Sequence, residues 1–85
     1  MATQEEFEQA VAQSKELTER PSNNILLQLY GLFKQATEGD VNTERPGGFD
    51  FKNIAKWDAW KSLQGTSQED ARAQYVQLVN SLRNA

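Results

Sequence analysis

Apolar residues recur along the chain at the three- and four-residue spacing of amphipathic helices, and helix breakers divide them into four segments. The pattern predicts helices at about 4–18, 22–38, 52–64 and 67–83. No segment alternates between apolar and polar residues over a length that would suit a strand. The sequence therefore predicts an all-α fold.

Local signals mark the ends of the predicted helices. Thr3 and Glu6 have the spacing of a capping box, which satisfies free amides at a helix start. The candidate caps of the second and fourth helices are small polar residues: Ser22 or Asn23, and Thr66 or Ser67. The predicted stops are Pro21, Gly39 and Gly65. Short links join the first two and the last two helices, which favours adjacent antiparallel pairs.

The second helix is apolar on two sides. Its main stripe consists of Ile25, Leu26, Leu29, Tyr30, Phe33 and Ala36, and Leu27 and Leu32 widen it. Tyr30, Phe33 and Lys34 share one helical face, because they lie three and four positions apart. Two interpretations stay open: core rings with a lysine that reaches solvent, or a surface that binds both a ring and an anion.

The third helix repeats this combination, with Lys52 and Lys56 beside Trp57 and Trp60. Core tryptophans and solvated lysines would explain the helix by itself. Lys15 also borders the apolar stripe of the first helix, so three helices could bring cations to one partly apolar rim. Lysines bind phosphate as point charges, and flat rings stack on bases. Such a rim would suit a ligand with phosphates, a base and an apolar part.

Residues 40–51 form a long predicted loop, and long loops are often functional. Its alternating polar residues look superficially like a calcium-binding loop. However, Arg45 stands where such a loop requires glycine, and Phe51 where it requires glutamate. The sequence therefore does not predict a calcium site.

Composition narrows the function further. The 85 residues suffice for one small domain, and they include no cysteine and no histidine. Zinc fingers, Cys or His nucleophiles and the Ser-His-Asp triad are thereby excluded, so we expect a protein that is not an enzyme. The net charge of −3 does not favour nucleic-acid binding. No apolar run approaches the ~18 residues of a membrane span. The acidic start is not a targeting peptide, so we expect a soluble intracellular protein.

Four segments together carry a resemblance to a known family: "LYGLFKQATEGD", "RPG", "KWDAW" and "SQEDA" followed by Tyr75. In this order and spacing, the chain from Phe7 to about Leu82 resembles the acyl-CoA-binding protein family. The resemblance implies a single domain over 1–85. It also implies a four-helix bundle of up-down-down-up topology, in which the long loop crosses over between the second and third helices.

By the same resemblance, the chain would bind long-chain fatty acyl-CoA thioesters, with no cofactor or metal, as a cytoplasmic, monomeric carrier and buffer. The implied ligand-binding residues are Lys15, Tyr30, Gly31, Leu32, Phe33, Lys34, Lys52, Lys56 and Tyr75. The alternative from a different class is a helical module that docks a partner protein and has no small-molecule ligand.

Several of these residues have an implied role. Tyr30 and Lys34 match the family's residues at the ribose 3′-phosphate and adenine, and Lys56 matches a second phosphate-binding lysine. Trp57 matches a residue near the acyl groove, whereas Trp60 is expected in the core. Two positions depart from the family: Phe33 replaces the usual tyrosine, and Ile54 replaces a basic or polar residue.

Overall fold

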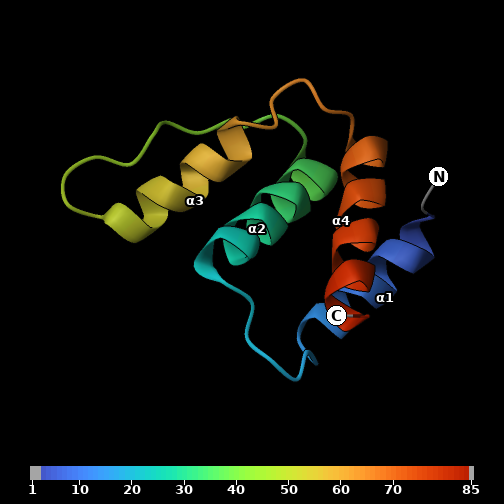
Figure 1. Cartoon of the computed structure of the whole chain (residues 1–85). Helices are drawn as coiled ribbons and strands as arrows, with labels where there is room; N and C mark the ends of the chain where they lie inside the picture. The colour runs from blue at the N-terminus through green and yellow to red at the C-terminus, as the bar shows by residue number, and fades with distance from the viewer. Residues whose placement is uncertain (1–2, 85) are drawn as a thin grey trace.

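The chain folds into four helices and no strand among residues 3–84, which the computed structural model describes. The helices are α1 (Gln4–Ser14), α2 (Asn23–Glu38), α3 (Phe51–Lys61) and α4 (Gln68–Arg83). The predicted all-α class is confirmed. In Figure 1, α1 and α4 run in one direction and α2 and α3 in the opposite direction, with the long loop crossing from α2 to α3. This is the expected up-down-down-up topology.

Side-chain caps explain where three of the four helices begin, whereas Asp50 makes no such bond at the start of α3. Thr3 and Glu6 form the predicted capping box of α1, while the hydroxyls of Ser22 and Ser67 accept backbone hydrogen bonds at the starts of α2 and α4. α2 ends at Glu38, and the residue that caps it, Gly39, takes a positive φ of 81° that glycine adopts without strain.

Two helices are shorter than the sequence predicts. α1 ends at Ser14 rather than near residue 18, because Ser14 Oγ donates to the Val11 carbonyl and the next two amides bond only three residues back. α3 ends at Lys61 rather than 64, since a turn with bonds from Leu63 and Gln64 to Trp60 and Lys61 follows it.

The helices do not pack as the predicted sequence-adjacent pairs. The backbones of α1 and α4, of α4 and α2, and of α2 and α3 pack closely, while among the described helices those of α1 and α2 and of α3 and α4 do not. Side chains of α1 and α2 still meet, as at Phe7 and Phe33. The expectation of adjacent antiparallel pairs was wrong, because the links of 15–22 and 62–67 are long enough to separate the helices they join. The resulting body is thin, with extents of 38 × 28 × 15 Å.

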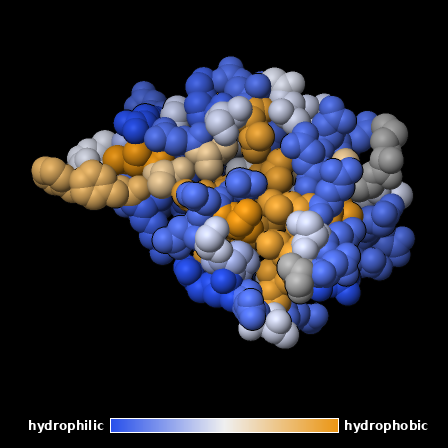
Figure 2. Space-filling model, viewed as in Figure 1, coloured by the Kyte–Doolittle hydropathy of each residue, from blue (hydrophilic) through white to orange (hydrophobic). Residues whose placement is uncertain are grey.

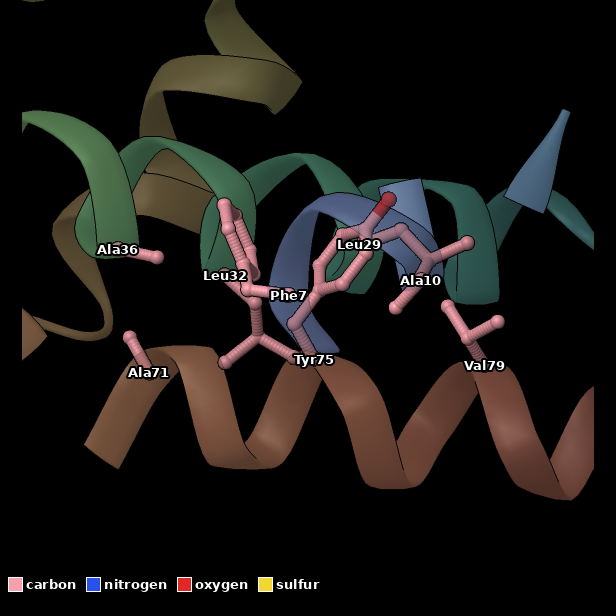
Figure 3. Close-up of a cluster of buried hydrophobic side chains, with 8 residues drawn as sticks. All are labelled: Phe7, Ala10, Leu29, Leu32, Ala36, Ala71, Tyr75 and Val79. Atoms are coloured by element: carbon pink, nitrogen blue, oxygen red, sulfur yellow. The ribbon is translucent and has the colours of Figure 1, made fainter. Parts of the chain in front are cut away.

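The main core lies where α1, α2 and α4 meet. Figure 3 shows its side chains pointing toward one another from these three helices: Phe7, Ala10, Leu29, Leu32, Ala36, Ala71, Tyr75 and Val79. On α2, the buried side therefore runs through Leu29, Leu32 and Ala36. Tyr30 is only half-buried and Phe33 is exposed, so the predicted main stripe of α2 is only partly the core stripe.

Candidate ligand-binding site

A hollow of about 270 Å³ opens between α2, the crossover loop and α3. The residues that line it are Tyr30, Lys34, Thr43, Glu44, Pro46, Asn53, Lys56, Trp57 and Trp60. Two lysines and three aromatic residues thus meet in one recess, although they come from separate parts of the chain. Of the two clusters that the sequence singled out, the structure brings Tyr30 and Lys34 together with Lys56, Trp57 and Trp60. Phe33 and Lys52 do not line the hollow.

Both lysines of the hollow lie over aromatic rings. Lys56 Nζ is 5.3 Å from the centroid of the Tyr30 ring, and Lys34 Nζ is 4.8 Å from that of the Trp60 ring. These are cation–π distances, at which the negative face of the ring attracts the ammonium group. Lys34 also forms an ion pair with Glu38. Each ring therefore holds one cation at the wall of the hollow.

The crossover loop is fastened to α3 beside the hollow. Trp57 Nε1 donates to the carbonyl oxygen and to Oγ1 of Thr43, both at 3.1 Å. Arg45 makes a two-bond ion pair with Asp58, at 2.9 and 3.0 Å. Its hydrogen bonds to the Asp58 carboxylate lower the pKa of Asp58 and raise that of Arg45. The loop is thereby fixed as one wall of the recess.

A second set of hydrogen bonds holds the C-terminal end of α2. Gln35, fully buried, donates from Nε2 to Asp40 Oδ1 at 2.8 Å and to the Thr66 carbonyl at 2.7 Å. The Gly65 amide also donates to Asp40 Oδ1 at 2.8 Å. Trp60 Nε1 donates to the Gly39 carbonyl at 2.8 Å, which ties α3 to the same point. Trp60 is only 4% exposed, so its predicted place in the core is confirmed.

Two predicted ligand residues, Gly31 and Leu32, lie inside the protein instead of in the hollow. A Cβ at Gly31 would be 2.8 Å from the Ala59 carbonyl oxygen, so the missing side chain lets α2 and α3 approach closely. Leu32 is 7% exposed and belongs to the core. Gly31 is therefore a helix-contact residue.

Phe33 and Tyr75 form an aromatic cluster with Phe7, apart from the hollow. The Phe33 ring centroid is 6.1 Å from that of Phe7 and 6.4 Å from that of Tyr75. Tyr75 is 4% exposed and its hydroxyl contacts Ser14 Oγ at 3.1 Å. Lys15, the residue after Ser14, is exposed at the end of α1. None of Lys15, Phe33 and Tyr75 lines the hollow.

Lys52 is exposed in the first turn of α3 and does not line the hollow. Beside it stands a feature that the sequence prediction omitted. Phe49 and Phe51 are 89% and 69% exposed, with ring centroids 6.1 Å apart. Figure 2 shows a hydrophobic projection at the left end of the molecule, where the crossover loop meets α3 in Figure 1. The sequence offered one sign of this apolar surface, because two phenylalanines stand in a predicted loop that is otherwise rich in glycine and polar residues.

A separate, more apolar groove of about 410 Å³ lies between α2, α3 and α4. Its α2 residues include Gln28 and Leu32, each two positions from Tyr30. Residues two apart on a helix point about 200° away from each other. This groove therefore opens on a different side of α2 from the hollow.

Comparisons with known proteins identify the family and the fold of this chain. A family model described as acyl CoA binding protein matches residues 4–79. Acyl-CoA-binding domain-containing protein 1 of Oryza sativa subsp. japonica is 52% identical over 96% of this chain and 90% of its own length. The crystal structure of Oryza sativa acyl-CoA-binding protein 2 superposes with a TM-score of 0.92 at 49% identity, covering 95% of this chain and 90% of that one.

One relative is much longer than this chain. Enoyl-CoA delta isomerase 2 of Rattus norvegicus is 51% identical over 99% of this chain, but the match covers only 22% of the isomerase. The match therefore assigns no isomerase activity to this chain. The family model, the near full-length relative and the shared fold lead to one conclusion: the chain belongs to the acyl-CoA-binding protein family.

Proposed function

We propose that this protein binds long-chain fatty acyl-CoA thioesters and serves as their intracellular carrier and buffer. The observation that carries the proposal is the hollow in which Lys34 and Lys56 lie over aromatic rings. Family membership and relatives named for acyl-CoA binding support it.

The hollow would hold the CoA head group. Phosphate oxygens would accept hydrogen bonds from the ammonium groups of Lys34 and Lys56, which reach the recess from two helices. The Tyr30 ring is half-buried and offers a flat surface for the adenine. Lys15 and Phe33 are exposed and would contact parts of the ligand that lie outside the hollow, whereas Tyr75 is buried in the core.

The acyl chain would cover the exposed phenylalanines at the start of α3. Phe49 and Phe51 present large apolar surfaces to solvent, and exposed apolar patches often mark binding sites. Burying one methylene contributes up to about 0.8 kcal/mol, so a long chain supplies several kcal/mol after its ordering cost. One ligand would thus satisfy both the cationic hollow and the apolar surface.

The protein-docking alternative finds no support in the family or in the names of the relatives. In the proposed role the chain is a monomer of the cytoplasm that needs no cofactor and performs no catalysis. Among residues 3–84, none of the helices has the length and apolar character to cross a bilayer. A carrier would present its ligand to other proteins and membranes by binding and releasing it.

Calorimetric titration with CoA and palmitoyl-CoA tests the two ends of the site. Lys56→Ala should weaken binding of both ligands by roughly tenfold or more, because charge-assisted hydrogen bonds contribute about 1.5–3 kcal/mol. Phe51→Ser should weaken palmitoyl-CoA by roughly tenfold and leave CoA unchanged.

The control is Lys61→Ala, which removes an exposed lysine from the last position of α3. Equal effects of Lys56→Ala and Lys61→Ala would contradict the placement of the head group. Unchanged palmitoyl-CoA affinity in Phe51→Ser would place the acyl chain elsewhere, with the groove beside Leu32 as the next site to test.

A further inference from the structure

The two lysines of the hollow differ in their internal partners. Lys34 lies over the Trp60 ring and also pairs with the Glu38 carboxylate, one turn later on α2. Lys56 lies over the Tyr30 ring, and neither of the two ion pairs among residues 3–84 includes it. One cation of the proposed head-group site therefore has a built-in counter-ion, and the other does not.

The position of Glu38 is unfavourable for α2 itself. Glu38 is the last residue of the helix, where the carbonyl end of the helix dipole repels a carboxylate. In addition, a lysine that precedes its glutamate by four residues is the weaker order of such a pair. Helix stability by itself therefore does not explain a carboxylate at this position.

Exposure to solvent makes the ion pair between Lys34 and Glu38 easy to displace. The Lys34 and Glu38 side chains are 24% and 42% exposed, and ion pairs that reach solvent are weak. A phosphate monoester carries up to two negative charges and three acceptor oxygens. It can therefore replace a single carboxylate at the Lys34 ammonium group, while the Trp60 ring, 4.8 Å away, continues to attract that group.

We infer that Glu38 is an internal competitor for the CoA phosphates, a role that rests on the proposed function of the hollow. In the unliganded protein, its carboxylate neutralises Lys34. When the ligand binds, its phosphate replaces the Glu38 carboxylate at the Lys34 ammonium group. The displaced carboxylate remains one turn away and repels the phosphate. Glu38 thereby lowers head-group affinity and favours release, which suits a carrier that must deliver its ligand.

Glu38→Gln tests the inference, because it removes the charge and keeps the shape of the side chain. We expect it to tighten the binding of CoA and palmitoyl-CoA by roughly three- to tenfold at low salt. The gain should shrink as ionic strength rises, since salt screens partly exposed charges. The matched control is Glu8→Gln on α1, an exposed site where the same change in net charge should leave affinity unchanged.

A double-mutant cycle shows whether Glu38 acts through Lys34. In a Lys34→Gln background, Glu38→Gln should produce less than half of its original gain on a logarithmic scale. An equal gain in both backgrounds, an equal gain from Glu8→Gln, or no gain in the wild-type background would overturn the inference. If the unsubstituted protein bound neither ligand, the proposed function would fall together with it.

Discussion

At the scale of single residues, Phe33 is both packed against other rings and exposed to solvent. Its ring contacts Phe7 and Tyr75, yet 36% of the residue is exposed. We expect Phe33→Ala to lower the free energy of unfolding by about 1–2 kcal/mol, since aromatic pairs contribute about 0.5–1.5 kcal/mol beyond buried area. If the exposed face stacks on the adenine, the same variant should lose about 1–3 kcal/mol of binding.

Denaturant unfolding and acyl-CoA titration of Phe33→Ala and Phe33→Tyr check this prediction. The tyrosine variant should behave like the wild type, because its hydroxyl can reach water from an exposed ring. A stability loss of about 3–5 kcal/mol with unchanged affinity would instead identify a core residue.

Residue spacing predicted part of the candidate site. Tyr30, Lys34 and Lys56 stood beside aromatic residues at helical spacing, and all three line the hollow. Spacing could not decide which side of α2 is buried, because this helix is apolar on two sides. It therefore could not show that Leu32 is buried in the core or that Phe33 is exposed, because both depend on how the other helices pack on α2.

At the scale of helices, the contact of α2 with α3 depends on Gly31. A Cβ there would lie 2.8 Å from the carbonyl oxygen and 3.0 Å from the carbonyl carbon of Ala59, and backbone atoms cannot rotate away. Gly31→Ala should therefore destabilise the fold by about 1–3 kcal/mol. Alanine would otherwise favour the helix by about 1 kcal/mol. It should also weaken CoA binding, because the hollow spans both helices.

Gly47→Ala is the matched control, since a Cβ at Gly47 meets no atom within 4 Å. Thermal unfolding and CoA titration of both variants give the comparison. A Gly31→Ala variant as stable as Gly47→Ala would show that α2 and α3 can separate without loss.

The hydrogen bonds that join the C-terminal end of α2 to the segment before α4 should respond to acid through Asp40. Hydrogen bonds from the Gly65 amide and then from Gln35 lower the pKa of Asp40 below its ordinary value of 3.8. A carboxyl with a lower pKa in the folded state stabilises the fold above its unfolded pKa. That contribution is lost as the pH falls through the folded pKa. We therefore expect this stabilisation to decline below about pH 5.

Asp40→Asn keeps an acceptor oxygen but removes the titration. Its melting temperature should lie below that of the wild type at pH 7, and the difference should narrow by pH 3. Melting curves at both values are the measurement, and a difference that stays constant with pH would rule out this role of the carboxylate.

Helix starts were predictable because capping is local: Thr3, Ser22 and Ser67 satisfy amides within three residues of themselves. The ends of α1 and α3 were not predicted correctly, because an apolar pattern continues past the last helical hydrogen bond. Leu17 and Leu63 fit the helical spacing, yet both lie in the turns and links that follow their helices.

At the scale of the molecule, helix order determines what α2 can present to a ligand. α4 covers one side of α2 and α3 contacts another, which leaves Tyr30 and Lys34 beside the crossover loop. Neither the order α1–α4–α2–α3 nor the exposure of Phe49 and Phe51 follows from helical periodicity, because both depend on contacts between distant segments. The topology was expected only from the family resemblance.

The most direct test of acyl-CoA binding is the melting temperature of the unmodified protein with palmitoyl-CoA, CoA or palmitate at equal concentrations. A ligand at a hundredfold excess over its dissociation constant stabilises the fold by about 2.7 kcal/mol. We predict a large upward shift with palmitoyl-CoA, a smaller one with CoA and almost none with palmitate. Equal shifts with palmitate and palmitoyl-CoA, or no shift with palmitoyl-CoA, would contradict a site that holds both the phosphates and the acyl chain.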